Sequence, residues 1–335
     1  MIIQNGLLFM VRWQAIGPIS VRLEDEGLSH DNISVYRYDK DQLDKLLKED
    51  KDYWSRVSFS LQYKSGYWLK LDFEVRSGEE PWRKAVNQVR LLLETLGLFK
   101  SSLGLLTIAG LYIKKIGEGS GVSGHFGWEI PTVGKPHYLL KKTEYDDFID
   151  LLTKYKGFVH NDRIPNQSSK QLKRINLARG FFARYLQTFD LVERHIFLSV
   201  ALEALVGEGQ HELKYRYSNR AALLLGDDIK RRTDVYGDIQ KAYNTRSDIL
   251  HGRVKWTVKP EEVLVYNEII RQMILRSISL YMRGYQNVSK ALDKCMHDSK
   301  KHAKLLKDAK AHFGKTSEYK EPEEFARSRG WAVRK

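Results

Sequence analysis

The sequence predicts an α+β protein, in which a mixed α/β domain over residues 1–158 precedes an all-α bundle. Two observations carry this prediction. Short segments of the first half alternate β-branched or aromatic residues with polar ones, whereas apolar residues of the second half recur at helical spacing. A stretch rich in glycine, proline and serine separates the two patterns. We therefore expect a linker at 159–169, the bundle at 170–286, and a basic helix and tail at 287–335.

The first domain combines strands with a few helices. Its clearest hairpin joins 57–63 to 67–75 through a connection that contains Gly66. Helices are expected at 43–54 and at 79–98, since Pro81 lies near the start of the second and apolar residues follow at helical spacing. Further strands are expected near 6–13, 18–23, 32–38, 55–63, 67–76 and 105–116, and a further helix at 143–155.

A glycine-rich stretch at 117–124 contains the pattern GxGxxG at Gly119, Gly121 and Gly124. This pattern binds dinucleotides where it opens a helix after a strand. No amphipathic helix follows it here, so we expect a loop without a nucleotide. The single Cys295 and ten scattered histidines offer no zinc-type spacing. The sequence therefore predicts neither a cofactor nor a metal.

The second half is predicted to be helical throughout. Residues 196–206 are apolar on nearly every side, which is typical of a helix at the centre of a bundle. Glu203 lies in this run, and a buried acid needs a cationic partner, for which Arg246 and Arg220 are both candidates. Pairing with Arg246 would orient that arginine, whereas pairing with Arg220 would be structural. Helices are expected at 168–188, 190–206, 211–226, 261–285 and 288–313, and the segment 228–251 is expected to form one helix or two.

The segment 243–253 carries the residues best suited to chemistry. Arg246 can hold a phosphate through its planar, charged fork, and a histidine such as His251 can transfer a proton near neutral pH. Gly252 is predicted to cap the end of the helix. Five positions on a regular helix advance about 500°, so the two side chains diverge by roughly 140°. They converge only if the last turn unwinds or a second copy faces the first; otherwise Arg246 pairs with an acid and His251 only ends the helix.

Three blocks, 193–207, 217–226 and 243–252, resemble in this order the Apea-like branch of the HEPN superfamily, with its RxxxxH motif. The resemblance covers roughly 168–285, about a third of the chain. It implies a HEPN-like helical bundle that forms a symmetric homodimer. It also implies a metal-independent endoribonuclease, a hydrolase of prokaryotic antiviral defence or a toxin, which leaves a 2′,3′-cyclic phosphate. Arg246 and His251 would be catalytic, supported by the residues Ser247, Asp248, Glu203, Arg220 and Tyr243.

Other members of that superfamily are non-catalytic, so an RNA-binding or dimerisation module is the alternative. The formal net charge of +14 favours a polyanionic partner such as RNA, although a basic surface without a partner has the same composition. The charge is uneven: residues 288–335 hold 13 lysines and arginines against 7 acids. One cysteine, no recognisable secretion signal and no apolar run long enough for a bilayer indicate a cytoplasmic protein without membrane contact.

Overall fold

The computed structural model describes the chain in eleven stretches. These are residues 10–18, 21–23, 27–38, 66–76, 79–101, 110–115, 121–125, 138–160, 169–208, 212–253 and 258–317. The chain divides into two compact units, one formed by residues 1–93 and 104–149 and the other by residues 94–103 and 150–335. An α+β class is confirmed, because one unit contains a sheet and the other is helical.

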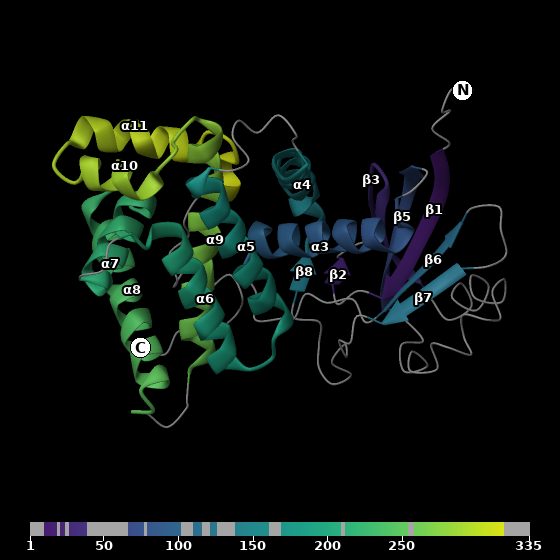
Figure 1. Ribbon diagram of the computed structural model, residues 1–335, viewed down its shortest axis with the longest axis horizontal. Helices are drawn as coiled ribbons and strands as arrows, with labels where there is room; N and C mark the ends of the chain where they lie inside the picture. The colour runs from purple at the N-terminus through teal and green to yellow at the C-terminus, as the bar shows by residue number, and fades with distance from the viewer. Residues whose placement is uncertain are drawn as a thin grey trace, which may run out of the picture. The chain divides into compact units, whose positions relative to one another are not determined.

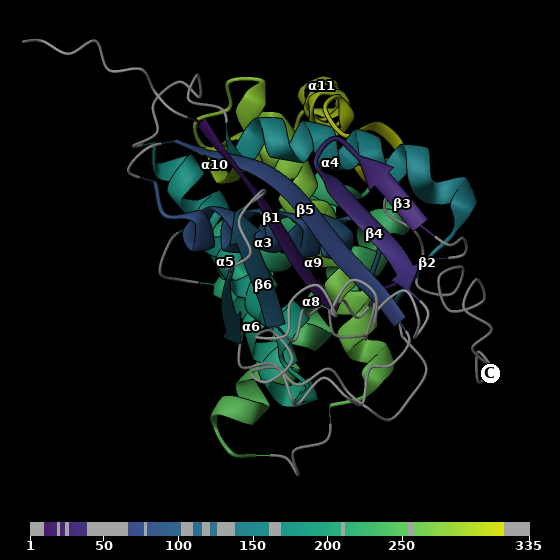
Figure 2. The same cartoon turned by 90° about the vertical axis from the view of Figure 1, so that its right-hand side faces the viewer.

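The first unit is built on an antiparallel sheet with the strand order β3-β4-β5-β1-β6-β7, of which Figure 2 shows β3 to β6 side by side. Its central strand β5 alternates buried Leu69, Leu71 and Phe73 with more exposed polar residues, as its sequence predicts. A short parallel pair, β2 with β8, forms a separate sheet. The strands are β1 (Met10–Pro18), β2 (Val21–Leu23), β3 (Gly27–His30), β4 (Ile33–Tyr38), β5 (Gly66–Arg76), β6 (Gly110–Lys115), β7 (Gly121–His125) and β8 (Tyr138–Leu140).

One prediction for this unit is wrong, and others fall on residues that the structure does not describe. The stretch 117–124 was expected to be a loop, but Gly121–His125 forms β7, whose backbone pairs with β6 from Gly121 opposite Lys114 to His125 opposite Gly110. The helix at 43–54 and the strand at 55–63 lie outside the described residues. Strand β5 pairs with β4 on one side and with β1 on the other. Its predicted hairpin partner, 57–63, lies outside the described residues.

The second unit is a helical bundle (Figure 1). The helices predicted between 168 and 285 are present with ends shifted by a few residues, and the segment 228–251 forms the single helix α8. Side chains of Ser169, Asp190 and Asp228 cap α5, α6 and α8 by accepting backbone N–H groups. The helices are α3 (Pro81–Phe99), α4 (Tyr145–Val159), α5 (Lys170–Gln187), α6 (Leu191–Val206), α7 (Leu213–Leu225), α8 (Ile229–Leu250), α9 (Pro260–Met282), α10 (Val288–Cys295) and α11 (Ser299–Lys310).

The single helix expected at 288–313 is in fact two. Helix α10 ends at Cys295, and the Asp298 side chain accepts the backbone N–H of Lys301 at 3.0 Å to begin α11. An aspartate that caps a new helix start competes with helix continuation, which explains the break. None of the described helices is long and apolar enough to cross a bilayer.

Helix α9 forms the core of the bundle, since its residues from Val263 to Tyr281 are buried except Val265. It carries a buried ion pair, in which Arg271 Nη2 lies 2.5 Å from Glu268 Oε1. Arg271 also donates to the carbonyl oxygens of Leu98 and Phe99, at 2.7 and 3.1 Å. These bonds hold the C-terminal end of α3 in the helical unit.

The observed division therefore differs from the predicted one, which placed everything before residue 159 in the first domain. Residues 94–103 and 150–158 belong to the helical unit, and α3 and α4 each contribute residues to both units. The buried carboxylate and guanidinium of α9 explain why residues 94–103 belong to the helical unit, because each needs hydrogen-bond partners and 98–101 supplies several of them.

Removing the cation of this pair provides a test of the core. We expect Arg271→Met to lower the free energy of unfolding by about 3–5 kcal/mol near pH 8, because Glu268 keeps a buried charge without its partner. Burial would raise the pKa of Glu268, but Arg271 holds it below its ordinary value. In the wild-type protein, ionised Glu268 therefore stabilises the fold at pH values above the ordinary pKa of a glutamate. This stabilisation is lost as the pH falls through the lowered pKa of the folded state. Without Arg271 burial dominates, so protonation at about pH 5 should reduce the deficit of the variant.

Chemical denaturation at both pH values measures this difference. The exposed Arg283→Met is the matched control and should change stability by less than about 0.5 kcal/mol. If the loss of unfolding free energy in Arg271→Met were the same at both pH values, the buried charge of Glu268 would not be its cause.

Candidate functional site

Helix α8 positions the predicted catalytic segment. Its inner face carries Val235, Ile239 and Ala242, which are buried, and Arg246 follows one turn later on the same face. The arginine thus points toward the bundle rather than into free solvent, and its side chain is 23% exposed.

Arg246 is paired with Glu203 of α6. Its Nη1 lies 2.9 Å from Glu203 Oε1, and the Glu203 side chain is 28% exposed. The structure thus selects Arg246 over Arg220 as the partner of Glu203. It also corrects one expectation, because Glu203 is half-buried on the outer side of α6 rather than enclosed at the centre of the bundle.

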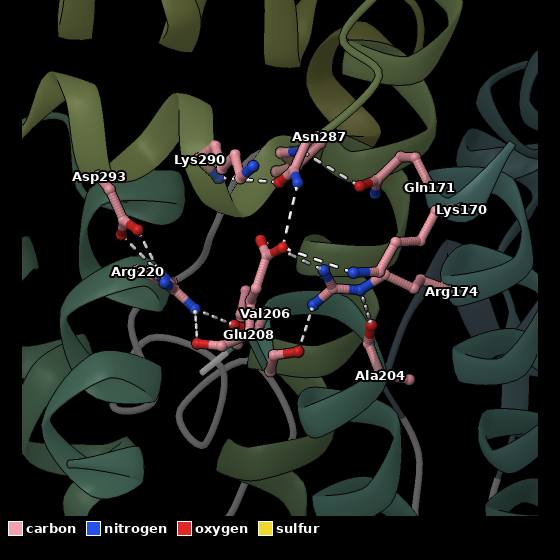
Figure 3. Close-up of polar contacts among 12 residues, drawn as sticks. Lys170, Gln171, Arg174, Ala204, Val206, Glu208, Arg220, Asn287, Lys290 and Asp293 are labelled. Carbon is pink, nitrogen blue, oxygen red and sulfur yellow. Dashed lines mark hydrogen bonds and ion pairs between the residues drawn. The ribbon is translucent and has the colours of Figure 1, made fainter. Parts of the chain in front are cut away.

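Arg220 has a structural role. Its side chain is 2% exposed and donates to Asp293 of α10 through Nε and Nη2, at 2.8 and 2.7 Å. Its Nη1 donates to Val206 O at 2.5 Å, while Arg174 donates to Ala204 O and Gly207 O (Figure 3). The two guanidinium groups thereby satisfy carbonyl groups at the C-terminal end of α6, which a helix leaves unpaired.

Tyrosines surround the Arg246–Glu203 pair. The rings of Tyr217 and Tyr243 meet edge to face with centroids 6.2 Å apart. Burial and the nearby Glu203 carboxylate raise the pKa of Tyr217 to about 12. Its hydroxyl is therefore neutral at physiological pH and able to donate a hydrogen bond. Tyr243, predicted as a supporting residue, thus lies beside this group.

The end of α8 presents His251 to solvent. Gly252 adopts a positive φ of 64°, its N–H donates to Ile249 O at 3.2 Å, and the N–H of Arg253 donates to Asp248 O at 3.0 Å. This pair of bonds is a Schellman motif and confirms the predicted glycine cap. His251 is exposed, and none of the described residues bonds to its imidazole.

The structure does not bring Arg246 and His251 together within one chain. Helix α8 remains regular to Leu250, so the last turn does not unwind and the two side chains diverge by roughly 140°. Ser247 accepts the backbone N–H of His251 at 3.0 Å, and Asp248 is half-buried without a described hydrogen bond to the imidazole.

A pocket of ≈190 Å³ lies among α6, α8 and α9, and its wall includes Ala242 from the inner face of α8. Burial, together with Asp234, raises the pKa of Asp238 in its wall to about 6. Burial also lowers the pKa of His195, whose Nε2 lies 2.9 Å from Ala242 O, so this imidazole is neutral. The sequence did not indicate this pocket, since its residues come from three helices. They are His195, Asp238, Lys241, Ala242, Thr245, Glu261, Glu262, Val265, Tyr266 and Ile269.

Neither predicted catalytic residue lines that pocket, although Thr245 precedes Arg246 in the chain. Among the described residues, no group of histidine, cysteine and acidic side chains is arranged to hold a metal ion.

Two glycines of α8 test the geometry of its end. Gly252→Ala should destabilise the protein by about 1 kcal/mol, because an L-residue at φ 64° is strained. Gly237→Ala, in the exposed interior of the same helix, should stabilise it by about 0.5–1 kcal/mol, since no atom lies within 4 Å of the added carbon. Thermal or chemical unfolding of both variants measures this; stabilisation by Gly252→Ala would mean that the helix does not end in this motif.

Comparison with protein-family models, curated proteins and solved structures finds no match to this chain. The functional argument therefore rests on the residues of α6 and α8.

Proposed function

We propose that the protein is a metal-independent endoribonuclease of the HEPN type. The observation that carries this proposal is the partly exposed Arg246–Glu203 pair, whose arginine lies on the helix that also ends at the exposed His251. Arg246 and His251 are the arginine and the histidine of the RxxxxH pattern. The proposed HEPN-like nature of the bundle rests on the sequence blocks described above.

RNA chemistry requires little more than these two groups. The 2′-hydroxyl of RNA is its own nucleophile, so an enzyme needs a proton carrier and a cation at the phosphate. His251 would act as general acid or base, and Arg246 would stabilise the charge that develops on the phosphate oxygens. The products would be a 2′,3′-cyclic phosphate and a 5′-hydroxyl.

The divergence of Arg246 and His251 supports a site composed of two chains. In a two-fold dimer, Arg246 of one protomer can face His251 of the other. Helix α6 offers an apolar surface for such a contact, because Val192, Ile196 and Val200 are half-buried and spaced four residues apart on one side. Glu203 lies on the same side of α6, and Leu250 of α8 is 59% exposed. A partly exposed apolar stripe of this kind favours a protein interface.

The first unit would select or regulate the RNA, and the biological role would be prokaryotic defence or toxicity, as the resemblance implies. The alternative is a non-catalytic RNA-binding or dimerisation module. One observation favours that alternative: Glu203 already occupies one nitrogen of the Arg246 guanidinium.

Loss of either proposed catalytic side chain distinguishes these two functions. We expect RNA cleavage that persists in a chelator and falls about 100-fold or more in His251→Ala and in Arg246→Ala. Glu203→Gln should lower activity less, because the arginine remains but is less well oriented. Gel analysis of mixed RNA, with chemical identification of the new ends, measures these effects.

Two further substitutions serve as matched controls. Arg231→Ala, at the start of α8, and the exposed His297→Ala remove the same kinds of side chain elsewhere and should retain full activity. Unchanged cleavage without His251 would exclude the proposed proton carrier, and absence of any cleavage by the wild-type protein would favour the binding module.

The composite site has its own test. If each site takes Arg246 and His251 from different chains, a mixture of Arg246→Ala and His251→Ala proteins forms heterodimers with one intact site. Random exchange makes about half the dimers mixed, which restores roughly a quarter of the wild-type sites. Activity that stays at the level of the single variants, after exchange is demonstrated by differently tagged chains, would reject the arrangement between chains.

A further inference from the structure

Residues 288–317, which include α10 and α11, carry a strong positive charge. The segment holds eight lysines and three aspartates, a net charge of +5. Each aspartate is already engaged: Asp293 with Arg220, Asp298 with Lys301 at 3.0 Å, and Asp308 with the Tyr285 hydroxyl at 2.8 Å. The acids of the segment therefore do little to neutralise its other lysines.

Lys300, Lys304 and Lys307 form one exposed stripe along α11, which we call the lysine stripe. They are spaced i, i+4 and i+7, so they share one side of the helix and follow each other by about 6 and 4.5 Å along its axis. The opposite side of α11 is buried through residues such as Leu305 and Ala309. Within the described residues, no acid pairs with any of the three lysines.

The chemistry of the stripe favours a nucleic-acid backbone over a lipid surface. An interfacial helix inserts aromatic or large apolar residues beside its lysines. Here the leucines of α11 are buried in the bundle, and the exposed residues beside the lysines are Ser299, Lys301 and Ala303, none of which is aromatic or large and apolar. Lysines act as flexible point charges that contact phosphates without reading bases.

The stripe is remote from the proposed catalytic residues. Helix α11 is attached to the beginning of α8, through the ion pair of Lys310 with Asp227 and a 3.0 Å contact between Arg232 and His302. His251 lies at the other end of α8, whose 22 residues span about 33 Å. A ligand that contacts both places must therefore be long.

We propose that the lysine stripe is a second contact site for RNA, which binds the phosphate backbone independently of base sequence and anchors long substrates. The choice of RNA as the polyanion rests on the proposed function, whereas the location of the site rests on the charges of α11.

The test compares RNA binding by two triple variants. In a His251→Ala background, which prevents cleavage, the stripe is removed by Lys300→Gln, Lys304→Gln and Lys307→Gln. The control removes three lysines that are paired with acids elsewhere, by Lys84→Gln, Lys154→Gln and Lys241→Gln. Both variants lose the same formal charge. Fluorescence anisotropy with a single-stranded RNA of about 40 nucleotides, longer than the usual site of a single-strand-binding fold, is measured over a range of salt concentrations.

Loss of three phosphate contacts should reduce the slope of log K against log salt by about 2, since each contact contributes roughly 0.7. This corresponds to roughly 100-fold weaker binding near 0.1 M salt, with little difference near 1 M. The control should change the slope much less, and a tetranucleotide should bind both variants alike. Because binding is measured without cleavage, an inactive wild-type protein would reject the enzyme but leave this result interpretable.

Three outcomes would overturn the proposal. The two triple variants could have equal salt slopes, or removal of the stripe could weaken binding of the long RNA and of the tetranucleotide equally. In a parallel measurement with vesicles of anionic lipid, removal of the stripe could weaken vesicle binding but not RNA binding. Circular dichroism and unfolding curves that match the background protein establish that both variants are folded.

Discussion

The helical unit depends on satisfying carbonyl groups where helices end inside the bundle. A helix leaves its last carbonyl oxygens without intrahelical donors, and burial makes such groups costly. Arginines supply the donors: Arg271 for α3, Arg174 and Arg220 for α6, and Arg276 for α7. Each guanidinium also carries a positive charge to the negative end of a helix. The positions of these helix ends are therefore fixed by side chains from other helices.

Helix α8 ends by a different mechanism, and this difference gives the proposed site its location. The backbone N–H groups of Gly252 and Arg253 bond to the carbonyl groups of Ile249 and Asp248, and no arginine side chain of the described residues caps this end. The turn stays at the surface, with His251 exposed. One turn earlier, Arg246 still faces the bundle and meets Glu203. The five-residue spacing of Arg246 and His251 on this helix thus separates the proposed proton carrier from the proposed cation, and this separation is the reason why the proposed chemistry requires a second chain.

Local patterns in the sequence predict the helices, the alternation of β5 and the cap at Gly252, because these depend on neighbours a few residues apart. They do not predict contacts between distant segments. Arg271 is 173 residues from Leu98, and Arg220 is 73 residues from Asp293, so neither the unit boundary nor the role of Arg220 is visible in a local pattern. The choice between Arg246 and Arg220 as the partner of Glu203 likewise needed the packing of α6 against α8 and α7. The pocket beside His195 was missed for the same reason.

The arginines of the bundle differ in how readily they can change partners. Arg220 and Arg271 are 2% and 4% exposed, and removing a partner from a buried charge costs about 3–5 kcal/mol. The Arg246–Glu203 pair is about a quarter exposed on both sides, and ion pairs in contact with water are worth about 0–1 kcal/mol. A phosphate can therefore replace Glu203 at the Arg246 guanidinium, or bind beside it, at a small cost in free energy. The buried capping arginines cannot change partners in this way. Exposure, rather than the presence of an arginine, distinguishes the residue proposed to bind substrate from those that hold the fold.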